Sequence, residues 1–154
     1  MDFATKRLSE DRDAVAPDGS EVRLLLELPR GSMAHFRLPA GEVSVAVRHR
    51  TVEEIWYVLG GRGEMWRRSG DREETVPLEP GVCLSIPTGT DFQFRAGAGG
   101  PLSVLGVTMP PWPGSGEAVA ADGCWTPTVP PGASTVNIQE GGRHDRATGR
   151  TLDR

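Results

Sequence analysis

The 154-residue sequence lacks the features that would direct a chain to an extracellular, membrane-bound or nucleic-acid-binding role. Its two cysteines, Cys83 and Cys124, are too few for the disulfide framework of a small secreted domain. Acidic residues outnumber basic ones by 21 to 17, and no basic stripe with interleaved aromatic residues appears. No apolar run reaches the length of a membrane span, and residues 1–7 lack the apolar core of a signal peptide. These absences predict a cytoplasmic protein with neither a nucleic-acid nor a membrane partner.

Glycine and proline, by contrast, are plentiful, at 20 and 13 residues. They separate short segments rich in β-branched and aromatic residues, a pattern typical of strands joined by tight turns. No segment has the 3.6-residue periodicity of an amphipathic helix. About nine strands at short, regular spacing favour an all-β fold, either a sandwich or a closed barrel. The predicted strands cover residues 22–28, 33–38, 43–49, 55–59, 64–68, 74–78, 82–86, 92–96 and 102–109.

The composition divides the chain into four parts. The first 20 residues are polar and end in the turn signal Pro17-Asp-Gly-Ser, so we expect a flexible N-terminal arm. After Met109 the sequence becomes proline-rich, and Trp112 and Trp125 carry too much apolar surface to remain in water. We expect that part to lie along the outside of the barrel and the polar part after it to be disordered. The predicted parts are the arm 1–20, the barrel 21–109, the Pro/Trp-rich extension 110–131 and the tail 132–154.

The stretch from residue 41 to residue 61 brings two chemically active side chains together. Val43, Val45 and Val47 recur with period two, which is the pattern of a strand with one buried face. His49 continues the same parity and should point to the same side. Glu53 and Glu54 break this run, and a second strand of β-branched and aromatic residues follows from Ile55. Two adjacent strands therefore place an imidazole and a carboxyl group at one end of a sheet.

This stretch resembles the first motif of the cupin superfamily, written G-x5-H-x-H-x4-E-x6-G. The matching residues are Gly41, His49, Glu54 and Gly61, and Val47 stands where the first histidine of the motif belongs. The resemblance implies a double-stranded β-helix, or jelly-roll, barrel.

A second stretch resembles the second cupin motif, G-x5-P-x-G-x2-H-x3-N. Gly81, Pro87 and Gly89 match it, whereas Phe92 replaces the histidine and Ala96 the asparagine. The two motifs occur in order with a short gap. They indicate the fold more strongly than the chemistry, because two of the four ligand positions of the family are apolar here.

Strand parity also predicts what lines the inside of the barrel. If the imidazole and the carboxyl group face inward, the alternating residues of their strands and of the segment 92–96 face inward too. Mostly apolar walls with a few convergent polar groups are the usual composition of a small-molecule site. The predicted pocket has the apolar walls Val47, Trp56, Phe92 and Phe94 and the polar pair His49 and Glu54.

A metal ion is the cofactor that the resemblance implies, since metal-binding cupins hold a divalent ion with the four motif ligands. Here the matched positions supply only His49 and Glu54, whereas catalytic metal sites generally have at least three protein ligands. His35 is expected on the outer face of its strand, Gln93 has the wrong parity, and Asp91 lies at a loop end. We therefore predict no cofactor. A divalent iron, manganese, nickel or zinc ion at His49 and Glu54 is the alternative.

Three functional hypotheses follow. The first is an enzyme of the isomerase, epimerase or cyclase kind, in which His49 and Glu54 move a proton on a bound carbonyl compound. In the second, the barrel binds or senses a small, partly apolar molecule without catalysis, and the two side chains only satisfy each other's hydrogen bonds. The third is a metal-dependent enzyme, such as a dioxygenase or sugar isomerase. Fold alone does not choose among them.

The strand Val22–Leu28 suggests a further partner. It is a nearly continuous apolar run, consistent with burial on both faces or against a second subunit. Many cupins pair through an outer strand. We therefore predict a homodimer.

Overall fold

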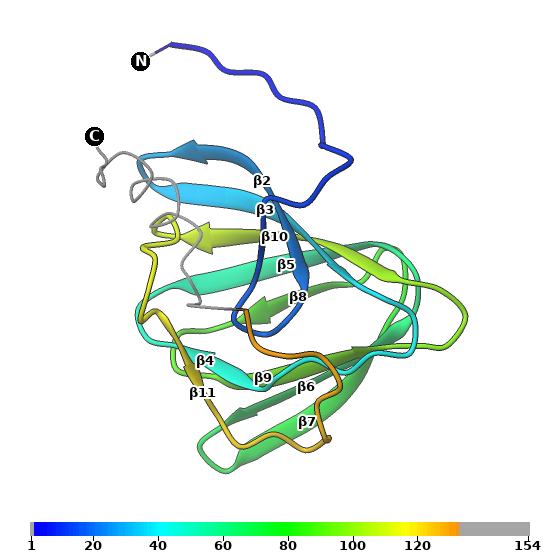
Figure 1. Cartoon of the computed structure of the whole chain (residues 1–154). Helices are drawn as coiled ribbons and strands as arrows, with labels where there is room; N and C mark the ends of the chain where they lie inside the picture. Colours follow the sequence, from blue (N-terminus) through cyan, green and yellow to red (C-terminus); the bar gives the residue numbers. More distant parts are fainter. Residues whose placement is uncertain (1, 133–154) are drawn as a thin grey trace.

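Two antiparallel sheets face each other in the computed structural model, which describes residues 2–132 (Figure 1). The described residues contain strands and no helix, which confirms the predicted all-β jelly-roll fold. Sheet A has the strand order β1-β2-β3-β10-β5-β8, and sheet B has the order β11-β4-β9-β6-β7. The strands are β1 (Ala14–Val15), β2 (Glu21–Leu28), β3 (Gly31–Leu38), β4 (Val47–His49), β5 (Glu53–Gly60), β6 (Gly63–Ser69), β7 (Arg72–Leu78), β8 (Cys83–Ile86), β9 (Asp91–Ala96), β10 (Leu102–Met109) and β11 (Ala118–Ala120).

Alternation of buried and exposed residues sets the inner and outer faces of the sheets. Along β5, Trp56 and Val58 are buried between the sheets, whereas Ile55 and Tyr57 are exposed on the outside. β10, its neighbour, alternates in the same way over its whole length. The apolar layer between the sheets includes Leu38, Val47, Trp56, Val58, Met65, Leu78, Leu84, Ile86, Phe92, Phe94, Leu102 and Val104.

β4 is shorter than the strand predicted over residues 43–49. Val43 makes only an isolated bridge to Arg95, and regular pairing begins at Val47. Ser44 lies between, and its side-chain oxygen accepts a hydrogen bond from the backbone N–H of Phe94. That side-chain contact competes with ladder pairing. The parity is nevertheless kept where it matters, because Val47 and His49 both face inward.

Part of the segment predicted to be a flexible arm, residues 1–20, is attached to the barrel. β1 pairs with the start of β2, and the guanidinium of Arg23 donates to the backbone carbonyls of Ser9 and Glu10. Asp18 and Ser20 are buried. Residues 2–8 are exposed and belong to no strand (Figure 1). The ordered part of the fold therefore begins before Glu21, because backbone and side-chain hydrogen bonds compensate for the polar composition.

The extension after β10 crosses to sheet B. Its strand β11 pairs with β4, and residues 123–131 run past the outer face of β9 (Figure 1). There the amide of Gln93 accepts from the backbone N–H groups of Cys124 and Trp125 and donates to the Trp125 carbonyl. The Trp125 ring lies 4.1 Å from the guanidinium carbon of Arg95. The predicted disordered tail 132–154 falls, apart from Gly132, outside the described residues.

The apolar run Val22–Leu28 is not buried on both faces. Val22 is buried, but the pairing of β2 with β3 is irregular between Leu24 and Glu27, and Leu26 and Leu28 are largely exposed. Across the described chain no helix has the length and hydrophobicity of a bilayer span.

Candidate functional site

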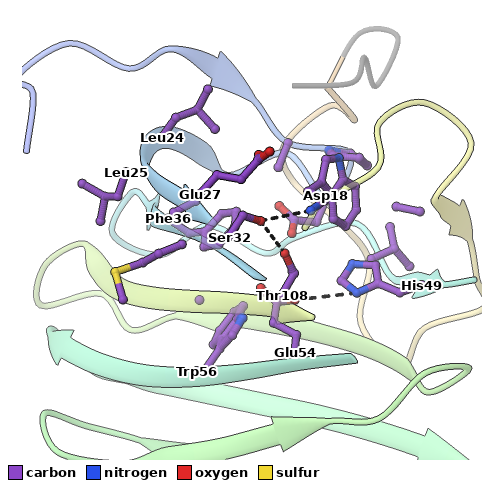
Figure 2. A pocket seen from close by; sticks show the side chains of 18 of the residues that line it. Asp18, Leu24, Leu25, Glu27, Ser32, Phe36, His49, Glu54, Trp56 and Thr108 are labelled. Carbon is purple, nitrogen blue, oxygen red and sulfur yellow. Dashed lines mark hydrogen bonds and ion pairs between the residues drawn. The ribbon is translucent and has the colours of Figure 1, made fainter. Parts of the chain in front are cut away.

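A cavity of about 250 Å³ opens between the sheets at the end where β4 ends and β5 begins (Figure 2). Its walls are mainly apolar, as expected for a small-molecule site. Three regions that are far apart in sequence contribute: the turn before β2, the inner faces of the two sheets, and the extension. The lining residues include Lys6, Asp18, Ser32, Phe36, Val47, His49, Glu54, Trp56, Phe92, Gly106, Thr108 and Trp112.

His49 projects from β4 into this cavity. Its ring packs edge-on between Phe92 and Trp112, with centroid distances of 5.1 and 5.0 Å. The Nδ1 atom lies 3.7 Å from Oε1 of Glu54, which is too long for a hydrogen bond. Among the described residues this buried Nδ1 atom has no hydrogen-bond partner. The pair is therefore adjacent but not mutually satisfied.

Glu54 is the second residue of β5 and lies opposite Thr108 of β10. A neighbouring glycine makes room for its carboxyl group. A Cβ atom at Gly106 would lie 2.5 Å from Oε2 of Glu54 and 2.8 Å from Cε2 of Phe36. The absence of a side chain at Gly106 thus determines where the carboxyl group can sit.

Burial keeps both groups of the pair uncharged at neutral pH. Desolvation raises the pKa of Glu54 to about 8, with the nearby Trp56 indole opposing the shift and Asp18 adding to it. Desolvation likewise lowers the pKa of His49 to about 4, with Glu117 opposing the shift. Loss of water dominates both shifts, so the cavity holds a neutral carboxylic acid beside a neutral imidazole.

Aromatic rings form the apolar walls around the pair. The Trp56 ring is stacked near Phe36 at 6.3 Å and meets Phe92 edge-on at 6.5 Å. Val47 and Phe92 line the cavity, at the two positions where the family motifs carry histidines. Phe94 is placed differently from the prediction. It is buried behind Trp56, at a centroid distance of 4.8 Å, and belongs to the core rather than to the cavity wall.

Asp18 is a cavity residue that sequence reasoning missed. Its carboxyl group accepts hydrogen bonds from the backbone N–H and the hydroxyl of Ser20. Burial raises its pKa, and these two hydrogen bonds partly offset the rise. The segment Pro17-Asp-Gly-Ser predicted a turn, but nothing in it indicated that the turn would contribute to the cavity wall.

Trp112 was also missed, because the extension was expected to lie wholly outside the barrel. Its backbone N–H donates to the Ser32 hydroxyl, which is hydrogen-bonded to the Thr108 hydroxyl. This chain of contacts holds the indole in the cavity wall, with its ring 5.0 Å from that of His49. A large aromatic residue in a proline-rich segment is the only signal the sequence offered.

Glu117 fixes the loop that joins His49 to Glu54. Its carboxylate accepts from the backbone N–H groups of Thr51 and Val52 and from the Thr51 hydroxyl, at 2.6–2.8 Å. Burial would raise the pKa of Glu117, but these hydrogen bonds and the nearby His49 outweigh burial and lower it. Glu117 is therefore a positioning residue that links the extension to the acid–base pair.

The donor set does not fit a divalent metal ion. Within residues 2–132 no three His, Cys, Asp or Glu side chains come together in a way that could hold one. Gln93 faces the extension, and Asp91 is paired with Arg48 and Arg68 at 2.6 and 3.0 Å. The cavity offers one imidazole and one protonated carboxyl group at the matched positions, fewer than catalytic metals require.

His35 faces away from the cavity, on the opposite side of β3 from Phe36. It was expected to be outside, yet it is buried, and its Nε2 is 2.6 Å from the Ser103 hydroxyl. Flanking strands on both sides cover it. It cannot complete a metal site with His49.

Comparison with known proteins agrees with this fold. The family model described as Cupin domain matches residues 34–108. An uncharacterised protein of Methanocaldococcus jannaschii is 30% identical over 116 residues, which cover 70% of this chain and 90% of that protein. The structure is similar to KdgF from Halomonas sp., with a TM-score of 0.56 and 22% identity, over 66% of this chain and 88% of KdgF.

CapF from Staphylococcus aureus, a capsular polysaccharide assembling protein, is similar at a TM-score of 0.60 and 14% identity. The match covers 68% of this chain and 32% of CapF, so the chain spans only about a third of that protein. These likenesses show the fold and not the reaction. The jelly-roll barrel, the two motifs and the matched family model together establish that the chain belongs to the cupin family.

Proposed function

We propose that the barrel cavity binds a small, partly apolar carbonyl compound and that His49 and Glu54 transfer a proton on it. The observation that carries this proposal is the pair itself: a neutral imidazole and a neutral carboxylic acid 3.7 Å apart in an apolar cavity. The reaction class is that of isomerases, epimerases and cyclases, which begin by moving a proton next to a carbonyl group.

The two neutral groups divide the work. The carboxylic acid of Glu54 donates its proton to the carbonyl oxygen, a role open only to a carboxyl group that stays protonated at pH 7. A ring nitrogen of His49 takes the proton from the carbon beside the carbonyl, and the C–H electron pair forms the C–C double bond of an enol. An imidazolium and a carboxylate remain. Return of a proton to a different carbon or face restores both groups and completes an isomerisation or epimerisation.

The simplest competing explanation is that His49 and Glu54 only hydrogen-bond each other. The geometry of the pair contradicts it. Nδ1 of His49 and Oε1 of Glu54 are beyond hydrogen-bond distance, and Nδ1 is buried without a partner in the described chain. Buried polar groups in native structures normally have partners. An unmet donor or acceptor at this point supports an external ligand, which either binding or catalysis would supply.

Hydrogen–deuterium exchange on a model ketone tests the catalytic role. Acetophenone is incubated in D2O at pH 7 with the protein, and NMR follows loss of the methyl signal. We expect exchange above the buffer rate, reduced about 100-fold or more by His49→Gln or Glu54→Gln. His35→Gln is the matched control, since it removes a buried imidazole outside the cavity. Binding of acetophenone with exchange only at the buffer rate would instead assign the protein to the non-catalytic binding class.

A further inference from the structure

Three buried N–H-bearing side chains around the cavity lack hydrogen-bond partners among the described residues. They are His49 at Nδ1 and the indoles of Trp56 and Trp112 at Nε1. All three line the same cavity, and their rings are in contact through Phe92 or directly. Trp56 lies close enough to influence Glu54 but makes no hydrogen bond of acceptable geometry with it. Unmet indole donors inside one cavity point to an acceptor supplied by a ligand.

The charges around the cavity indicate what kind of acceptor. Lys6 is the one cation among the described residues that line it, and it lies on the exposed arm. Asp18 is buried in the wall with its carboxyl group already hydrogen-bonded to Ser20. An anionic ligand would be desolvated with no buried counter-ion and next to this acid. A cation would find the carboxyl groups of Asp18, Glu27 and Glu54 but would leave the indole N–H groups without an acceptor. A neutral oxygen acceptor needs no buried counter-ion and gives the indole N–H groups a hydrogen-bond partner.

We infer that the ligand is a neutral, flat carbonyl compound whose oxygen is recognised by the indole N–H groups of Trp56 and Trp112. The inference rests on the proposed function and specifies the ligand class of the same site. The flat body fits between the ring walls that Phe36, Trp56 and Phe92 form. Ser32 and Thr108 bind each other and hold Trp112 in place, so their hydroxyls are engaged.

A matched series of aromatic probes tests the ligand class by NMR titration. Acetophenone carries the neutral oxygen, ethylbenzene lacks it, and benzoate replaces it with an anion. We expect acetophenone to bind about 3- to 10-fold more tightly than ethylbenzene for each hydrogen bond gained, and benzoate to bind least. Benzoate as the tightest ligand, or equal affinity of acetophenone and ethylbenzene, would overturn the inference.

A tryptophan substitution tests the recognition residue. Trp112→Phe keeps an aromatic ring and removes the N–H, so it should weaken acetophenone about 3- to 10-fold and leave ethylbenzene nearly unchanged. Trp125→Phe is the control, since Trp125 stacks on Arg95 at the outer face of sheet B. Equal weakening of both probes by Trp112→Phe would mean loss of packing and would contradict a polar role. Probe selectivity without deuterium exchange would keep this inference and reject the catalytic proposal.

A separate observation concerns the outer face of sheet A. Ile55, Tyr57 and Leu59 of β5 are 45%, 47% and 44% exposed, and Met33 of β3 is 39% exposed. The strand register places Leu105 beside Tyr57, and Val107 between Ile55 and Met33. The apolar face of sheet A is thus one continuous surface, made of Met33, Ile55, Tyr57, Leu59, Leu105 and Val107. Contiguous apolar surfaces of this kind mark interaction sites.

The rest of the described chain leaves this face uncovered. The extension runs over sheet B, where it engages Gln93, and does not cross sheet A. β5 and β10 are both paired along both edges, so a partner cannot add a strand and has to pack on the face.

We propose that a second copy of this chain covers the apolar face of sheet A. None of its six residues is charged, so the same surface can oppose itself about a two-fold axis without repulsion. Four of its large apolar side chains are 39–47% exposed, and burying such side chains is what the apolar centre of a dimer interface of ~800 Å² per subunit requires. Sheet-on-sheet packing suits such a flat face. This places the predicted homodimer contact on sheet A instead of on the edge strand β2.

Two exposed-residue variants separate these surfaces by light scattering during size-exclusion chromatography. We expect the wild-type protein to be a dimer at micromolar concentration, Tyr57→Glu to be a monomer with an unchanged circular dichroism spectrum, and Leu26→Glu on β2 to remain a dimer. A monomeric wild type would overturn the proposal, and so would a dimer broken by Leu26→Glu but not by Tyr57→Glu.

Discussion

The two ends of the barrel interior are built differently. At one end Leu38, Val58 and Leu102 pack with Phe94 and Leu78 into a closed apolar core. At the other, the same strands supply side chains that surround a 250 Å³ cavity with unmet polar atoms. Both ends follow the same inward parity along β3, β5 and β10. The closely packed core end therefore contributes most to stability. Within the described part of the chain, the cavity end contains buried polar atoms without hydrogen-bond partners, which a ligand would supply.

Truncation at the core end should produce the largest loss of stability. Leu38 is fully buried and pairs across the sheet with Leu102. We expect Leu38→Ala to lower the free energy of unfolding by about 2–5 kcal/mol through lost transfer energy and a new cavity. Urea denaturation measures the loss. Probe selectivity measured well below the unfolding midpoint should be unchanged, and a change in it would mean that the two ends are coupled.

Replacing the buried acid Glu54 at the cavity end should raise the free energy of unfolding at pH 7 instead of lowering it. The pKa of Glu54 is raised to about 8 from 4.5, so between those pH values the folded state keeps a proton that the unfolded state has lost. The contribution of Glu54 to stability therefore falls as pH rises from 4.5 to 8, while the lowered pKa of His49 acts in the opposite direction between about 4 and 6.5. Glu54→Gln should remove this fall and raise stability at pH 7 by no more than about 3 kcal/mol. Denaturation curves at pH 5 and 8 check it, and parallel pH profiles of both proteins would show that Glu54 is charged.

A substitution at Gly106, which lies against the Glu54 carboxyl group, should have a smaller effect at the cavity end of the barrel. A methyl group at Gly106 would collide with the Glu54 carboxyl group and the Phe36 ring. We expect Gly106→Ala to destabilise the fold by about 1–3 kcal/mol and to abolish deuterium exchange by displacing the acid. Gly99→Ala is the control, because a side chain there meets no atom within 4 Å. Full exchange activity in the Gly106→Ala protein would show that the acid's position is not critical.

The smallest expected effect on stability concerns Glu117, which holds the loop between His49 and Glu54. Glu117 has a lowered pKa, so its charged form stabilises the fold above about pH 4.5, and this contribution is lost as pH falls below that value. Glu117→Gln should cost roughly 1–2 kcal/mol at pH 7, with a difference from wild type that shrinks in acid. Thermal melts at pH 7 and pH 4 measure this. A difference that stays constant with pH would indicate lost packing and not a lost charge.

The sequence was sufficient for the architecture because strand parity is a local property. Alternation along residues 53–60 and 102–109 predicted which side chains point inward. The motif spacing brought His49 and Glu54 to one site, but β4 and β5 lie in opposing sheets and not at one end of a single sheet as expected. The positions of Val47 and Phe92 at the family's ligand sites also followed from spacing alone. Phe94 shows the limit of this reasoning, since parity specifies a face and not the depth at which a side chain lies along it.

The segments that complete the cavity from remote parts of the chain became known only from the folded structure. Asp18, Trp112 and Glu117 reach it from the turn before β2 and from the extension, where no strand periodicity constrains them. The charge states of His49 and Glu54 were likewise out of reach, because they depend on how much water the assembled walls exclude. Local pattern thus determined the barrel and the direction of its side chains. Enclosure and desolvation arise from contacts between remote parts of the chain, and those decided the character of the site.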